Sequence, residues 1–380
     1  MSRQAEDALR AAVRDLANGA RTAPELAGRA LRRGRRLRRW RRAVATGSAL
    51  AALGLLAGPY VWLRHDPPLQ TTTWAPPPAA PTASTPAAAS TPSVATAPRG
   101  DWTRAILELP GGWVITGATS TGGPAAQGYA LDRERGRYVA TARRYEEVWA
   151  APRGGVAVVV DYERRGEVGL LDLGTGAVRW VRVGSYIMTP HWSPDGRRVA
   201  LTVLDKDTGG FSLGVLTAAT GGYRTFPVDP TQYYCTDYCF FTWSRDGREV
   251  VFQQTDRNAP RSESIRHPRR GVQLFSADNG RPTRFVPVPG DPAGPWAWSP
   301  DGKLVVVQGQ REPLLVETGS GRVVRTLSTA DVVWVSEDRL LYRRPSGSRD
   351  FVLADLTGRE LVRQPLPHEL VDREITVAPR

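Results

Sequence analysis

Two stretches near the middle of the chain gather the side chains best suited to recognising another molecule. Residues 229–241 read DPTQYYCTDYCFF, and residues 255–271 read TDRNAPRSESIRHPRRG. Tyrosine and arginine anchor many interfaces because both combine a large contact area with directed hydrogen bonds, and a guanidinium also pairs with carboxylate or phosphate. We therefore predict a binding patch for an anionic partner, made by Tyr233, Tyr234, Tyr238, Arg257, Arg261, Arg266, Arg269 and Arg270. The alternative is that both stretches are ordinary surface insertions.

The two cysteines of the sequence, Cys235 and Cys239, lie within the first stretch. They are too few for a disulfide scaffold or a four-cysteine metal site. In an oxidising compartment they predict a local disulfide that pins the loop. Free thiols and metal ligation are the alternatives.

Two signatures of catalysis are missing from the sequence. It contains no H-E-x-x-H pair and no phosphate-binding loop. Asp195, Asp246 and Asp301 recur at equivalent places in turns, which favours turn stabilisation over acid–base catalysis. Asp205 and Asp207 offer oxygen ligands to calcium, although a solvated loop is the simpler interpretation. We expect no metal centre, no cofactor and no enzymatic activity.

Short β-strands must position these residues, because the chain from residue 100 onward consists of short apolar runs broken by turns. Three clear hairpins repeat, HWSPDGRRVALTV (191–203), FTWSRDGREVVFQ (241–253) and AWSPDGKLVVVQ (297–308), and weaker copies begin at 108, 148 and 333. Equivalent points in the six copies are separated by 42, 42, 51, 55 and 36 residues. Such periods, with two hairpins per unit, are typical of β-propeller blades. We predict an all-β fold, a six-bladed β-propeller, with seven blades as the alternative.

The W-S-P-D-G hairpins resemble the repeat of the TolB and WD40-like (PD40-type) β-propeller families, with Trp192, Trp243 and Trp298 at matching places. The resemblance extends over nearly all of residues 105–365 and implies the fold. It implies little about function, since such propellers serve as binding platforms, scaffolds and enzyme appendages. We expect units to start near 105, 147, 189, 240, 296 and 332. Either residues 102–108 or residues 370–378 must close the ring.

Propeller geometry also predicts where the candidate patch lies. Connections between successive blades, and the loops joining the second and third strands of a blade, emerge on one face. Residues 229–241 are such a connection and residues 255–271 such a loop, and both are unusually long. We therefore expect them to lie on the same face, between blades three and four.

The N-terminal hundred residues have a different composition. Residues 43–63 contain no charged side chain over 21 positions, enough for one transmembrane helix. Eight arginines stand just before it, in residues 32–42, so the positive-inside rule predicts a cytoplasmic N-terminus and an extracellular C-terminal domain in the cell membrane. A cleaved signal peptide is the alternative, but the apolar stretch is long and has no small-x-small cleavage site near its end.

The remaining segments complete the predicted organisation. Residues 1–42 carry a net charge of +9 and read as a short α-helical, basic cytoplasmic tail, lying against anionic lipid or docking onto a cytoplasmic protein. Residues 64–100 form a Pro/Thr/Ala-rich linker, and residues 101–380 form the propeller. The propeller region has a net charge of only +3, so no nucleic-acid partner is expected. Scarce lysine with abundant arginine and alanine is typical of a high-GC organism such as an actinobacterium.

These features predict a membrane-tethered, extracytoplasmic β-propeller that binds an envelope protein or anionic ligand. One form of this hypothesis adds signalling through the cytoplasmic tail. The layout of the tail resembles membrane proteins paired with extracytoplasmic-function sigma factors, so an anti-sigma-like regulator is one alternative. An enzyme that processes sugars or lactones in the central channel is another. It would require several polar residues on the inner strands, which instead offer mainly valine, tryptophan and alanine.

Overall fold

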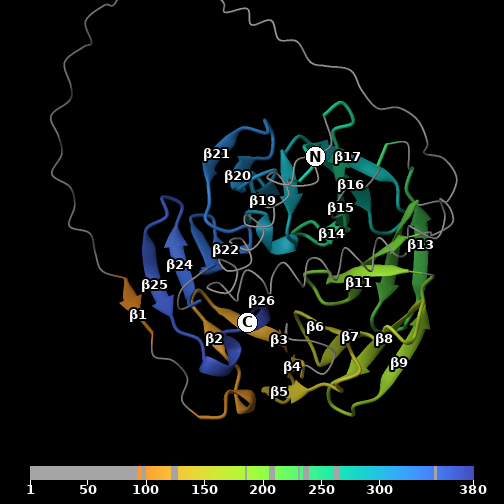
Figure 1. Ribbon diagram of the computed structural model, residues 1–380, viewed down its shortest axis with the longest axis vertical. Helices are drawn as coiled ribbons and strands as arrows, with labels where there is room; N and C mark the ends of the chain where they lie inside the picture. Colours follow the sequence, from red (N-terminus) through yellow and green to blue (C-terminus); the bar gives the residue numbers. More distant parts are fainter. Residues whose placement is uncertain are drawn as a thin grey trace, which may run out of the picture. The chain divides into compact units, whose positions relative to one another are not determined.

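A computed structural model of the chain describes residues 92–95, 100–120, 127–184, 186–204, 210–229, 232–233, 239–259, 266–345 and 349–380. The chain divides into two units, residues 1–91 and residues 92–380, and all described residues belong to the second. The second unit forms six β-sheets, which Figure 1 shows as the blades of a ring. This arrangement confirms the predicted six-bladed all-β propeller and excludes seven blades.

Each of the middle four blades is a four-stranded antiparallel meander, from the innermost to the outermost strand. Blade two contains β6 (Glu147–Ala150), β7 (Val156–Val160), β8 (Glu167–Asp172) and β9 (Val178–Arg182). Blade three contains β10 (Ile187–Trp192), β11 (Arg198–Leu204), β12 (Phe211–Thr217) and β13 (Tyr223–Pro227). Blade four contains β14 (Thr242–Trp243), β15 (Glu249–Thr255), β16 (Arg269–Ser276) and β17 (Pro282–Val286). Blade five contains β18 (Gly290–Pro292), β19 (Leu304–Gly309), β20 (Pro313–Glu317) and β21 (Val323–Thr326), with the short 3-10 helix η2 (Pro295–Ala297).

The first and last blades carry additional strands. Blade six contains β22 (Val332–Ser336), β23 (Arg339–Arg343), β24 (Phe351–Asp355) and β25 (Glu360–Gln364), and β1 (Ser93–Val94) adds a parallel fifth strand beside β25. Blade one contains β3 (Trp113–Ser120), β4 (Tyr129–Asp132) and β5 (Arg137–Ala140). The same sheet includes the short strand β2 (Glu108–Leu109), which pairs with β3, and two 3-10 helices, η1 (Trp102–Arg104) and η3 (His368–Leu370), lie near it.

The C-terminal strand closes the ring. Strand β26 (Arg373–Pro379) pairs antiparallel with β3 along its whole length, from Arg373 opposite Ser120 to Pro379 opposite Trp113, and lies near the centre of the ring (Figure 1). Of the two segments considered from the sequence, residues 370–378 therefore supply this strand. Strand β2 pairs only with Trp113 and Val114, so the weak hairpin copy at 108–118 is not the innermost hairpin of blade one.

A half-buried arginine holds the segment that leads into the closing strand. The Arg343 guanidinium donates hydrogen bonds to the carbonyl oxygens of Leu370 (3.1 Å), Val371 (2.5 Å) and Arg373 (2.7 Å). Because an arginine presents five donors in a fixed plane, one side chain of blade six can satisfy several carbonyl groups at this seam.

The Ser-Pro-Asp-Gly turns explain the recurring aspartates. Asp195 Oδ1 accepts hydrogen bonds from Ser193 Oγ (2.5 Å) and from the Arg197 backbone N–H (3.0 Å), while Gly196 adopts a φ of +70°. The same contacts recur at Asp246 and Asp301. These side chains therefore stabilise turns, as the sequence indicates.

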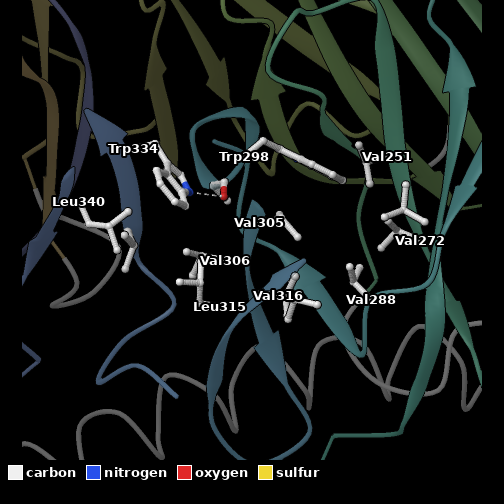
Figure 2. Packing of buried hydrophobic residues seen from close by; sticks show 14 of the residues in the cluster. Val251, Val272, Val288, Trp298, Val305, Val306, Leu315, Val316, Trp334 and Leu340 are labelled. Carbon is white, nitrogen blue, oxygen red and sulfur yellow. Dashed lines mark hydrogen bonds between the residues drawn. The ribbon is translucent and has the colours of Figure 1, made fainter. Parts of the chain in front are cut away.

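Tryptophans of the repeat connect neighbouring blades. Trp192 donates from Nε1 to the Trp149 carbonyl (2.7 Å), Trp243 donates to the His191 carbonyl (2.8 Å), and Trp334 donates to the Ala297 carbonyl (3.0 Å). Figure 2 shows the last of these bonds together with the packed valines and leucines of blades four to six. These three tryptophans thus combine a large buried area with one directed bond to the preceding blade. Trp298 is buried in the same way, but its Nε1 has no hydrogen-bond partner among the described residues.

In the described part of the chain, no helix has both the length and the apolar character needed to cross a membrane. The predicted cytoplasmic tail, the transmembrane helix at 43–63 and most of the linker lie outside the described residues.

Candidate functional site

Two faces of the propeller follow from the strand order. We call the face that carries the connections between blades and the loops between second and third strands the connection face. The opposite one, with the hairpin turns, is the turn face. The segment between β13 and β14 and the loop between β15 and β16 both emerge on the connection face. The two predicted stretches therefore begin and end on one face, in blades three and four.

The connection from β13 to β14 is anchored by Tyr233. This side chain is 4% exposed, and its ring packs edge-on against Phe275 at 5.4 Å and Phe252 at 6.4 Å. Burial raises the pKa of the Tyr233 hydroxyl. Tyr233 is therefore a core residue that fastens the connection, and we remove it from the surface that a partner can touch.

Arg269 is also interior. Its side chain is 3% exposed and forms a bidentate ion pair with Asp291 of blade five, Nε to Oδ1 at 2.8 Å and Nη2 to Oδ2 at 3.0 Å. Arg266 reaches the same carboxylate, with Nη1 3.0 Å from Oδ2. One aspartate thus forms ion pairs with two arginines of the predicted patch and joins blade four to blade five.

The stem of the long loop in blade four is closed by hydrogen bonds. The Asp256 backbone N–H donates to the Pro268 carbonyl (2.9 Å), and His267 Nε2 lies 2.6 Å from the Asp256 carbonyl. On this stem Arg257 and Arg270 are exposed. Tyr234, Tyr238 and Arg261 lie outside the described residues, so their part in the patch stays a prediction.

Cys239 is fully buried beside Phe241 and is not a free thiol. Its predicted partner, Cys235, lies outside the described residues, so the pairing stays a prediction. Asp205 and Asp207, the weak calcium candidates, lie outside them as well. Within the described ranges, no group of three or more His, Cys, Asp or Glu side chains is placed to hold a metal ion.

A group of aromatic side chains at the inner strands, made by Trp149, His191 and Phe240, was missed by the sequence analysis. His191 on β10 stacks on Phe240 at 5.0 Å with an interplanar angle of 13°, and the Trp149 ring of β6 lies 6.3 Å away. Burial lowers the pKa of His191 to about 4, and its Nε2 is a buried atom without a hydrogen-bond partner in the described structure. His191 comes directly before Trp192 of the repeat. This fixed position relative to the repeat tryptophan is the signal from which its place in the fold could have been predicted.

Arg245 spans the inner ends of three blades at the turn face. It stands where two other hairpins have proline, and its guanidinium donates to the Trp298 carbonyl of blade five (2.9 Å) and the Trp334 carbonyl of blade six (3.5 Å). The group lies 5.7 Å from the Trp296 ring, which itself packs edge-on against Trp113 at 5.3 Å. Burial lowers the pKa of Arg245. These side chains occupy the inner edge of the ring with backbone and aromatic contacts.

Comparisons with known proteins concern the fold alone. No protein-family model matches the chain, and a search of curated proteins finds no match. Similar solved structures include TolB from Acinetobacter baumannii, with 17% identity and a TM-score of 0.46 over 71% of this chain and 67% of that one. A protein described as a TolB from Agrobacterium tumefaciens shows 15% identity and a TM-score of 0.40 over 70% and 98%. The dihydro-heme d1 dehydrogenase NirN shows 17% identity and a TM-score of 0.37, over 69% of this chain and 66% of that one.

Proposed function

We propose that this chain is a binding module, without catalytic activity, that recognises an anionic envelope ligand or protein through the connection face of blades three and four. The observation that carries the proposal is that both loop stems on that face are held in place by buried side chains. We call the surface formed by these stems the rim. Arg269 and Asp291 fix one loop stem and Tyr233 fixes the other. Arg257 and Arg270 are exposed beside them.

Bracing matters because a preorganised surface loses less conformational entropy when a partner binds. Rim arginines mainly speed and orient the encounter with an oppositely charged partner. The propeller below them supplies the rigid support from which functional loops usually project. This favours recognition of a phosphate- or carboxylate-bearing wall polymer, or of an acidic protein surface.

Charge reversal tests this surface. We expect the double variant Arg257→Glu/Arg270→Glu to bind polyphosphate or poly-L-glutamate at least about tenfold more weakly than the wild type, since two attractive contacts become repulsive. The matched control is Arg248→Glu/Arg281→Glu, which places the same changes on exposed residues of the turn face of blade four. Binding is measured by calorimetry at fixed ionic strength. Equal losses in both double variants would show a nonspecific charge effect and reject the patch.

We further propose that the module is tethered to the cell membrane by residues 43–63, with the propeller outside the cell. The support is the uncharged stretch and the eight arginines before it. An alkaline phosphatase fusion after residue 99 is expected to be active, and one after residue 40 inactive. The reverse pattern would contradict the orientation and remove the oxidising compartment that the Cys235–Cys239 pairing requires.

A further inference from the structure

Three side chains from three different blades form a row at the inner edge of the turn face. Trp113 begins β3 of blade one, Trp296 lies in η2 of blade five, and Arg245 lies in the turn between β14 and β15 of blade four. The rings of Trp113 and Trp296 meet edge-on, with centroids 5.3 Å apart, and the Arg245 guanidinium lies 5.7 Å from the centroid of the Trp296 ring. Both distances lie within the range of attractive aromatic and cation–π contacts.

These contacts join blades that are not neighbours in the ring. Blade six stands between blades five and one, and blade five stands between blades four and six (Figure 1). Trp296 nevertheless reaches Trp113 of blade one, and Arg245 reaches the Trp334 carbonyl of blade six at 3.5 Å. Because blades radiate from the axis of a propeller, side chains of blades that are not adjacent can meet only near that axis.

Burial places the three side chains in two layers. Trp113 is 3% exposed, although it directly follows the exposed turn residues 111–112, and Trp296 and Arg245 are half-buried. Gly111 has a φ of +79° and lies so close to Val335 of β22 that a side chain at this position would collide with it. The turn of blade one is therefore seated on the inner strand of blade six, with Trp113 beneath it.

Arg245 is the member of the row that hydrogen bonds fix in place. Its Nη1 donates to the Trp298 carbonyl of blade five at 2.9 Å, one residue beyond the 3-10 helix that carries Trp296. Blades three and five have Pro194 and Pro300 at the equivalent position, and proline offers no side-chain donor. The departure from the repeat in blade four thus supplies the contact that holds the row together.

We propose that Trp113, Trp296 and Arg245 form a plug that closes the axis of the ring at the turn face, with Arg245 as the residue that keeps the Trp296 ring in place. A ligand that reaches the innermost strands therefore enters from the connection face, the face that carries the rim. This consequence rests on the proposed function, whereas the plug itself depends only on the contacts at the turn face.

Hydroxyl-radical footprinting of the full-length protein, with oxidation assigned to individual tryptophans by mass spectrometry, tests the plug. We expect Arg245→Ala to raise the oxidation rates of Trp113 and Trp296 by about threefold to tenfold, the change in local opening that follows from losing a cation–π contact and a hydrogen bond. Arg245→Pro restores the Ser-Pro-Asp-Gly turn of the other blades while removing the same contacts, so it is expected to give the same result with the turn intact.

Arg224→Ala is the matched control. Arg224 also donates to a carbonyl group of the next blade, that of Asp278 at 2.9 Å, and lies 5.9 Å from the ring of Phe226, but it stands on the outermost strand of blade three. This variant should leave the oxidation of Trp113 and Trp296 at the wild-type rate. Unchanged oxidation in both Arg245 variants, or an equal rise in Arg224→Ala, would overturn the plug. Because no ligand is added, neither outcome depends on whether the rim binds an anion.

Discussion

Asp291→Ala is expected to lower the free energy of unfolding by about 3–5 kcal/mol, among the largest effects of any single substitution in this propeller. The carboxylate is 6% exposed and pairs with the 3% exposed Arg269. Its removal takes the Asp291 carboxylate away from a guanidinium that is buried between blades four and five. Urea denaturation of the wild type and the variant, followed by tryptophan fluorescence, measures the loss.

Asp278→Ala is the matched control, because Asp278 also pairs with an arginine of a neighbouring blade. Its partner is Arg198 at 2.8 Å, but the Asp278 side chain is 80% exposed. Solvent screens such a pair, so we expect a loss of about 1 kcal/mol or less. The double variant Arg269→Met/Asp291→Leu should recover much of the lost stability, because it removes the buried charge together with its partner. Equal losses for Asp291→Ala and Asp278→Ala would contradict the assigned role of burial.

The repeat predicted the blades because each blade is encoded by a short, local sequence pattern. A Trp-Ser-Pro-Asp-Gly hairpin encodes its own turn, and even the weak copies at 148 and 333 form the hairpins β6–β7 and β22–β23. The closing strand has no such signal. Residues 373–379 pair with a strand about 260 positions earlier, and no turn residue marks a contact over that distance. The sequence therefore predicts the number of blades more readily than the closure of the ring.

The candidate patch shows a different limit of the sequence. Both stretches were correctly placed on one face from the sequence, because blade geometry fixes the face on which each kind of connection emerges. Residue types and loop length did not separate Arg269, which is interior, from Arg270, which is exposed, although the two are adjacent in β16. Alternation along a strand decides which side faces inward, and the partner that neutralises Arg269 comes from the next blade. Charge pairing between blades is a property of the assembled ring, so a count of arginines overestimates those available to a ligand.

His191 is expected to make the propeller less stable in acid. Burial lowers its pKa to about 4 in the folded protein, whereas an unfolded chain has the ordinary value near 6.5. The folded state therefore resists protonation that the unfolded state accepts. The contribution is fully present above pH 6.5 and is lost as the pH falls towards 4, at about 1.4 kcal/mol per pH unit. Between pH 7 and pH 4.5 the loss from this one residue amounts to about 2–3 kcal/mol.

His191→Phe removes the titrating group while keeping a flat ring that can stack on Phe240, and it also removes the unsatisfied Nε2. Carboxylates elsewhere destabilise both proteins in acid, so the informative quantity is the difference in unfolding free energy between variant and wild type at each pH. We expect that difference to shift in favour of the variant by about 2–3 kcal/mol on going from pH 7 to pH 4.5. His368→Gln, at an exposed histidine of η3, is the control and should follow the wild type. A difference that stays constant with pH in His191→Phe would mean that the imidazole is already protonated, or free to become so, inside the folded ring.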